Sequence, residues 1–127
     1  MTSSKEIAQL FDFPASVLLV EDNPIIAMNT EALLEELGID RVLTAGTVAD
    51  ALALVDRERF DLAILDLKLG DEEDSLPIAE QLDARGVPII FATGFGEDIA
   101  LPEGHGAARV LKKPYSFDDL ERLFRAG

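Results

Sequence analysis

The sequence predicts an α/β fold in which a parallel sheet carries helices on both faces. Short apolar runs alternate along the chain with longer segments whose apolar residues recur at helical spacing. That alternation is typical of a parallel sheet covered by helices. The apolar runs, such as 17–20 and 62–65, contain no alternating polar residues, which indicates strands buried on both sides. A chain of 127 residues leaves little room for a second domain.

Three strands and two helices are predicted in the first half. The strands are 17–20, 41–45 and 62–66. Asn23-Pro24 begins the first helix, because proline is favoured in a first turn, and Gly38 is a suitable C-terminal stop. The second helix follows Thr47, with apolar residues on one face.

The second half continues the same alternation. A third helix is predicted over about 75–85, and it is followed by a strand at 88–93. Glycines and prolines in 94–106 leave room for only a weak short helix around 97–101. A fifth strand covers 109–111, and Ser116 caps a final helix. We assign residues 1–14 to an N-terminal extension that can form a short helix, and 15–127 to the main domain.

Composition limits the function classes. The formal charge is −14 and there is no cysteine, so disulfides and thiolate chemistry are excluded. An acidic chain lacks the basic face that nucleic acid or an anionic membrane requires, and we expect neither as a partner. No apolar stretch could span a bilayer and no signal peptide begins the chain. These features predict a cytoplasmic protein.

Chemically useful side chains follow four of the predicted strands. Glu21 and Asp22 follow the first strand and Asp66 ends the third, while Thr93 ends the fourth and Lys112-Lys113 follows the fifth. Parallel strands bring their carboxyl ends to one rim, where open α/β sheets bind ligands. We therefore expect these residues to converge.

The three acids favour a hard cation. Carboxylates crowded on one rim repel one another unless a cation lies among them, and oxygen ligands without His or Cys favour Mg²⁺ over zinc. The alternative is that Asp22 only caps the following helix. Asp66, held at the end of an apolar run, could act as a nucleophile and form an aspartyl phosphate; the alternative is a loop acid that caps a turn.

Thr93 and Lys113 complete a site for a phosphoryl group. A hydroxyl and a compact ammonium both suit phosphoryl oxygens, although either residue could have a purely structural or solvated role. Lys112 could supply the same positive charge and is the alternative to Lys113. The turn after the first strand reads Glu-Asp-Asn-Pro, so no glycine-rich phosphate loop is present there. The single histidine, His105, lies in a Gly-rich loop and is not a catalytic candidate.

Four motifs in order resemble the receiver domain of two-component response regulators. They are Val-Leu-Leu-Val-Glu-Asp-Asn-Pro at 17–24, Leu-Asp at 65–66, Ala-Thr-Gly at 92–94 and Lys-Lys-Pro at 112–114. Each motif is weak alone, but four in order make the resemblance specific, and it covers about residues 16–126. The resemblance implies a flavodoxin-like, doubly wound five-stranded sheet of order 2-1-3-4-5.

The resemblance also implies roles for the rim residues. Asp66 is the expected phosphoacceptor. Glu21, Asp22 and Asp66 are the expected Mg²⁺ ligands, joined by the backbone carbonyl of Lys68. Thr93 is the expected switch hydroxyl. Lys113, directly before proline, matches the family's phosphoryl-binding lysine better than Lys112.

The sequence departs from the family pattern in two places. Receivers usually carry Tyr or Phe three residues before the lysine, where this chain has Val110, and the turn after Asp66 is unusually acidic. The run Phe-Ala-Thr-Gly at 91–94 resembles a subgroup of single-domain receivers with that motif. Kinases of that subgroup belong to an atypical histidine-kinase class.

We therefore predict a stand-alone receiver that takes a phosphoryl group on Asp66 from a sensor histidine kinase with Mg²⁺. It would signal through a downstream protein, or serve as a phosphate shuttle or sink, and a homodimer is left open. It would not be an enzyme beyond its own phosphorylation and dephosphorylation. One alternative is a pseudo-receiver that binds partners without being phosphorylated. The other is a phosphatase, but Lys68 stands where that chemistry would need a second acid.

Overall fold

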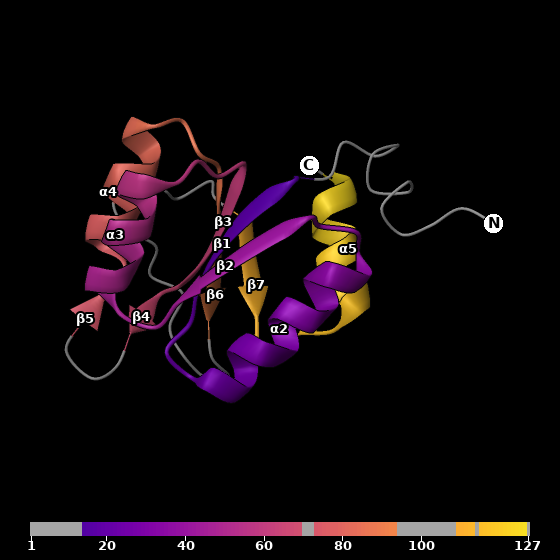
Figure 1. Ribbon diagram of the computed structural model, residues 1–127. Helices are drawn as coiled ribbons and strands as arrows, with labels where there is room; N and C mark the ends of the chain where they lie inside the picture. Colours follow the sequence, from indigo (N-terminus) through magenta and orange to yellow (C-terminus); the bar gives the residue numbers. More distant parts are fainter. Residues whose placement is uncertain (1–13, 70–72, 94–108, 114, 127) are drawn as a thin grey trace.

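The computed structural model describes residues 14–69, 73–93, 109–113 and 115–126. Five parallel strands form one sheet in the order β2-β1-β3-β6-β7 (Figure 1). In chain order this is 2-1-3-4-5, so the predicted doubly wound sheet is confirmed. The strands are β1 (Ser16–Val20), β2 (Arg41–Ala45), β3 (Leu62–Asp66), β6 (Ile89–Thr93) and β7 (Arg109–Lys112).

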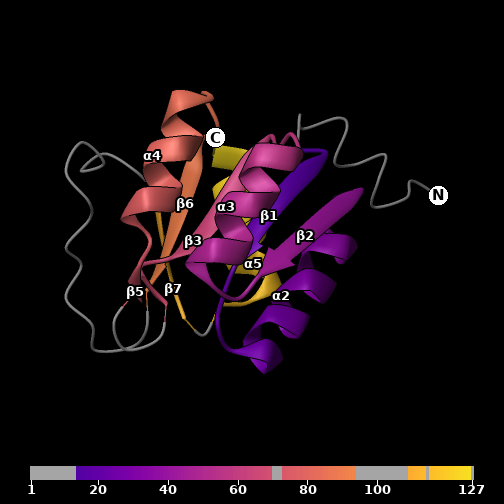
Figure 2. The same cartoon turned by 60° about the vertical axis from the view of Figure 1, so that its left-hand side comes forward.

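The helices of the described part of the chain cover both faces of the sheet (Figures 1 and 2). The described helices are α2 (Pro24–Glu36), α3 (Val48–Arg57), α4 (Leu76–Ala84) and α5 (Phe117–Ala126). Leu18 and Val20 of β1 pack with residues of α3 and α4, whereas Val17 and Leu19 pack with residues of α2 and α5. Successive side chains of a strand point to opposite faces, so β1 contributes to two cores and must be apolar throughout.

The helix ends follow local chemistry. Asn23 caps α2, and its side chain accepts hydrogen bonds from the N–H groups of Ile25 and Ile26. Gly38 and Gly86 have φ values of 93° and 72°, a conformation that side chains other than glycine adopt at a cost. They end the first and third predicted helices at the positions where the sequence places stops.

Most element limits agree with the sequence predictions within one or two residues. A short antiparallel hairpin, β4 (Lys68–Leu69) with β5 (Glu73–Asp74), was not predicted, because two residues per strand are too few to show periodicity. The predicted helices within 1–14 and at 97–101, and His105, lie outside the described residues. Among the described helices, none has the length and apolar character that crossing a membrane requires.

Candidate functional site

The register of the sheet brings the predicted site residues to one rim. Val20 pairs with Leu65, so Glu21 and Asp66 leave the ends of neighbouring strands side by side. Asp66 pairs with Ala92, which makes Thr93 the next residue beyond this pair. Strands far apart in the chain thus place their last residues together, as expected for a parallel sheet.

Three carboxylates form a compact cluster at this rim. One oxygen from each of Glu21, Asp22 and Asp66 lies within 4.8 Å of the others. Glu21 and Asp66 are only 4% and 5% exposed, whereas Asp22 is exposed. Buried carboxylates need a compensating cation, and an all-oxygen donor set open to solvent on one side suits Mg²⁺. The residues present therefore fit the ion that the sequence analysis predicts.

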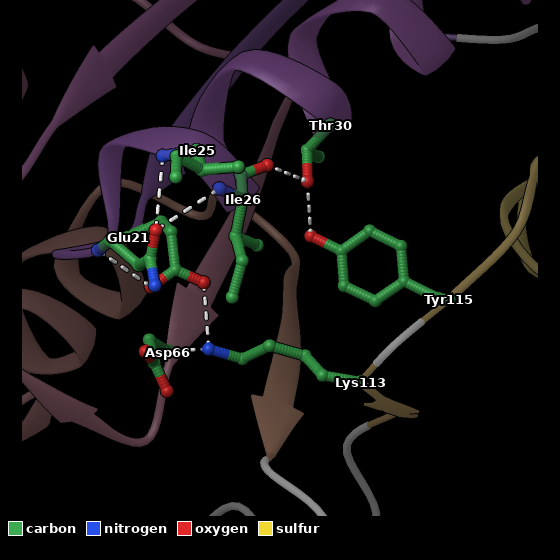
Figure 3. Close-up of polar contacts among 8 residues, drawn as sticks. Glu21, Ile25, Ile26, Thr30, Asp66, Lys113 and Tyr115 are labelled. Carbon is green, nitrogen blue, oxygen red and sulfur yellow. Dashed lines mark hydrogen bonds and ion pairs between the residues drawn. The ribbon is translucent and has the colours of Figure 1, made fainter.

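Lys113 supplies one cation to this cluster. Its Nζ donates to Oε1 of Glu21 at 2.6 Å and to Oδ2 of Asp66 at 2.9 Å (Figure 3). The Lys113 side chain is 14% exposed, whereas Lys112 is exposed. Geometry therefore distinguishes the two lysines and places Lys113 at the carboxylates, which is the lysine that the family resemblance favoured.

Burial and hydrogen bonding shift the pKa values of two groups in this cluster. Burial raises the pKa of Glu21, and its hydrogen bonds from Lys113 and Asn23 reduce this effect without cancelling it. Burial alone would lower the pKa of Lys113, but its bonds to Glu21 and Asp66 outweigh burial and leave the pKa raised. The lysine is therefore held as a cation, which is the form that binds phosphoryl oxygens.

The first turn of α2 is tied to the carboxylate cluster. The backbone N–H of Asn23 donates to Oε2 of Glu21 at 3.1 Å, while Oδ1 of Asn23 accepts from Ile25 and Ile26 at 3.0 and 3.3 Å. The helix cap is therefore Asn23. The alternative role for Asp22, a helix cap, is not the arrangement observed.

Thr93 and Lys113 are joined by their backbones at the rim. The N–H of Lys113 donates to the carbonyl of Thr93 at 2.8 Å, and Thr93 is 1% exposed. Val110 is half-buried on β7 and pairs with Phe91. Lys68 begins β4, two residues after Asp66.

A buried hydroxyl pair beside the cluster was missed by the sequence analysis. Tyr115 and Thr30 lie 2.6 Å apart, hydroxyl oxygen to hydroxyl oxygen (Figure 3). Burial raises the pKa of Tyr115, despite an opposing hydrogen bond with Thr30, so its phenol stays protonated and can donate. The only signal in the sequence was a tyrosine directly after Lys-Lys-Pro.

Comparison with known proteins assigns the chain to a family. The response regulator receiver domain family matches residues 17–125. Phyllosphere-induced regulator PhyR of Methylorubrum extorquens is 32% identical over 106 residues, covering 82% of this chain and 40% of that protein. Transcriptional regulatory protein PdtaR of Mycobacterium tuberculosis is 31% identical over 110 residues, covering 84% of this chain and 53% of that protein. The chain thus spans about half the length, or less, of these two relatives.

Solved structures agree with this assignment. The solution structure of SdrG from Sphingomonas melonis Fr1 is 44% identical, with a TM-score of 0.75, over 85% of this chain and 91% of that one. A structure of the BeF3-activated conformation of SdrG from Pseudomonas melonis Fr1 is 41% identical, with a TM-score of 0.74, over 88% and 94%. With the family matched over most of the sequence, and the acidic rim and lysine arranged as described, the chain belongs to the response regulator receiver domains.

Proposed function

We propose that this receiver domain accepts a phosphoryl group on Asp66 from the phosphohistidine of a sensor histidine kinase, or from a small acyl phosphate. The observation that carries the proposal is the Lys113 ammonium, which lies between Glu21 and Asp66 at 2.6 and 2.9 Å. A buried carboxylate with a neighbouring cation, on a rim open to solvent, suits an incoming dianionic group.

In the proposed step, an oxygen of Asp66 attacks phosphorus while the bond from phosphorus to the donor nitrogen breaks. The new bond is the phosphorus–oxygen bond of an aspartyl phosphate, and the leaving imidazole takes a proton from solvent. Lys113 reduces the repulsion between the carboxylates and the phosphoryl oxygens, because its charge already lies beside Asp66. A kinase of the atypical class named above remains our proposed donor.

The proposed Mg²⁺ ligands are Glu21, Asp22, Asp66 and the backbone carbonyl of Lys68. The ion would supply charge neutralisation for phosphoryl oxygens during transfer. The three carboxylates support this ligand set because their oxygens lie within 4.8 Å of one another. Lys113 contributes one positive charge against these three carboxylates, so a divalent cation would bring the cluster closer to neutrality.

The proposed output is a change of surface that a partner protein reads, or removal of phosphate from a relay. Thr93 would bind the phosphoryl group through its hydroxyl, and its backbone bond to Lys113 would carry the shift into β7. Val110 lacks the ring that commonly reports such a shift in receivers. The formal charge of −14 favours a basic protein surface as partner and disfavours nucleic acid.

The phosphoacceptor is tested by incubating the protein with a small acyl phosphate and Mg²⁺ and measuring its intact mass. We expect one added phosphoryl group, which Asp66→Asn abolishes. Asp118→Asn is the matched control, because Asp118 is an exposed carboxylate of α5 and should leave the adduct intact. No adduct from any acyl phosphate or phosphorylated kinase would reject the proposal and favour a pseudo-receiver.

The metal site is tested separately by calorimetric titration with Mg²⁺. Asp22→Ala removes one carboxylate from the cluster and should weaken Mg²⁺ binding by about tenfold or more, because ligand charge sets affinity. Asp118→Ala removes the same charge from α5 and should leave binding unchanged. Equal Mg²⁺ affinities for all three proteins would place the ion elsewhere.

A further inference from the structure

The Tyr115–Thr30 pair has a defined direction. Oγ1 of Thr30 donates to the carbonyl of Ile26 at 2.9 Å, a bond that threonine commonly makes one turn back within a helix. A hydroxyl has one proton, so Thr30 must accept the bond from Tyr115 at 2.6 Å. Both residues are buried, with Thr30 at 0% and Tyr115 at 8% exposure.

This bond adds a second connection between the neighbourhood of Lys113 and α2 (Figure 3). Tyr115 lies two residues after Lys113 in the chain, and its bond to Thr30 ties it to α2. The partner of the lysine, Glu21, is held at the start of the same helix through the N–H of Asn23. Both ends of the Lys113–Glu21 ion pair are thus attached to α2.

We propose that Tyr115 is a positioning residue for Lys113. Its hydroxyl, donated to Thr30, keeps the ammonium between Glu21 and Asp66, where it would meet the phosphoryl group. The proposal rests on the proposed function, since it assigns a residue to the site of that reaction. It goes beyond the proposed function by placing control of the lysine in a side chain whose hydroxyl bonds to Thr30 on α2.

The proposal predicts opposite effects on two measurements. A loosened Lys113 would meet the phosphoryl oxygens less often, which slows phosphorylation. The same loosened lysine would compete less with Mg²⁺ for Glu21 and Asp66, so Mg²⁺ should bind as tightly as before or more tightly. General damage to the site would lower both the phosphorylation rate and the Mg²⁺ affinity, because the carboxylates themselves would be displaced.

Tyr115→Phe is the informative variant. It keeps the ring in its core position among Leu120 and Phe124 and leaves Thr30 bonded to Ile26, so no buried donor loses its acceptor. We expect phosphorylation by a small acyl phosphate to slow by about three- to tenfold, the range for one lost hydrogen bond. We expect calorimetry to show a Mg²⁺ affinity equal to or higher than that of the wild type.

Variants at Thr30 test the bond from its other side. Thr30→Val removes the acceptor and should slow phosphorylation as Tyr115→Phe does, while Thr30→Ser keeps a hydroxyl and should restore the rate. The double variant Tyr115→Phe/Thr30→Val should be no slower than the slower single variant, because both remove one bond. Thr44→Val is the matched control, since it removes a different hydroxyl bond to α2, the one from Thr44 to Glu31.

Tyr115 also provides its own optical signal, because the chain has one tyrosine and no tryptophan. Tyrosine fluorescence should change when Mg²⁺ binds the carboxylates that Lys113 contacts in unphosphorylated protein, and Thr30→Val should alter that change whereas Thr44→Val should not. This readout needs no phosphorylation, so it separates the two proposals. A wild type that never becomes phosphorylated rejects the proposed function, and the fluorescence and Mg²⁺ measurements still decide the role of Tyr115.

Three results would overturn the inference. One is phosphorylation of Tyr115→Phe at the wild-type rate. Another is a parallel loss of Mg²⁺ affinity and phosphorylation rate, which would show a merely structural role. The last is failure of Thr30→Ser to restore what Thr30→Val loses.

Discussion

The backbone N–H of Lys113 donates to the carbonyl oxygen of Thr93 at 2.8 Å. This one bond fixes the end of β7 to the end of β6, immediately beyond the last paired residues, Thr93 and Lys112. The proposed switch hydroxyl and the proposed phosphoryl-binding lysine are therefore neighbours by strand pairing. A movement of either residue along the rim would act directly on the other.

Lys113→Met should destabilise the protein in the absence of Mg²⁺, because Glu21 and Asp66 then stay buried without their ammonium. We expect the free energy of unfolding to fall by about 1–3 kcal/mol or more, because a buried acceptor left unsatisfied costs about that much and a charged one costs more. Added Mg²⁺ should recover part of this loss by binding the folded state. Urea denaturation with and without Mg²⁺ measures both effects.

Lys112→Met is the control for this experiment. Lys112 is exposed, and surface substitutions usually change stability by no more than about 0.5 kcal/mol. Equal losses for the two lysine variants would contradict the structural distinction between them.

Thr93→Ala and Val110→Ala should differ in how they affect the response to a phosphoryl mimic. Thr93 lies at the rim beside Asp66, whereas Val110 pairs with Phe91 within the sheet. We expect Thr93→Ala to remove most amide shift changes near the site when beryllofluoride and Mg²⁺ are added. Val110→Ala should leave those changes nearly intact, and a large loss there would show that Val110 transmits the signal.

Two serines at helix starts should respond in opposite ways to alanine. The hydroxyl of Ser116 accepts from the N–H of Asp119 at 3.2 Å, so Ser116→Ala should cost about 1 kcal/mol. The hydroxyl of Ser75 is buried and makes no side-chain cap bond, nor any other bond among the described residues. Removing it should cost nothing, or should stabilise the protein by up to about 1 kcal/mol. Thermal or urea unfolding compares the two variants.

Asp119 should contribute stability at neutral pH and lose it in acid. The backbone N–H of Ser116 donates to its carboxylate at 2.9 Å, which, with the Ser116 hydroxyl, lowers the pKa of Asp119 below its ordinary 3.8. A carboxyl with a lowered folded-state pKa stabilises the fold above its ordinary pKa and ceases to do so as pH falls through the folded value. The difference in unfolding free energy between wild type and Asp119→Asn should therefore shrink below pH 3.8. A difference independent of pH would contradict this.

Several elements could be predicted because their signals are local. Strand β3 follows from an apolar run that ends at Asp66, and α2 follows from Asn23-Pro24 at one end and Gly38 at the other. The residues alone did not decide whether Lys112 or Lys113 reaches the carboxylates. The resemblance to a family favoured Lys113, and the structure shows its contacts. Adjacent residues of a strand face opposite ways, and only the register of β7 against β6 decides which lysine reaches Glu21.

The sequence by itself determined the α/β fold, the order of its elements and the set of polar residues at the strand ends. Hydrophobic periodicity, helix caps and stops act over a few residues, so they are readable along the chain. Only the tertiary structure decided that Lys113 bridges Glu21 and Asp66, and that Tyr115 donates to Thr30, 85 residues away in the chain. These contacts depend on the pairing of β1, β3 and β7 and on the packing of α2 against the sheet. Each contact joins residues far apart in the chain, and the sequence around either residue does not identify its partner.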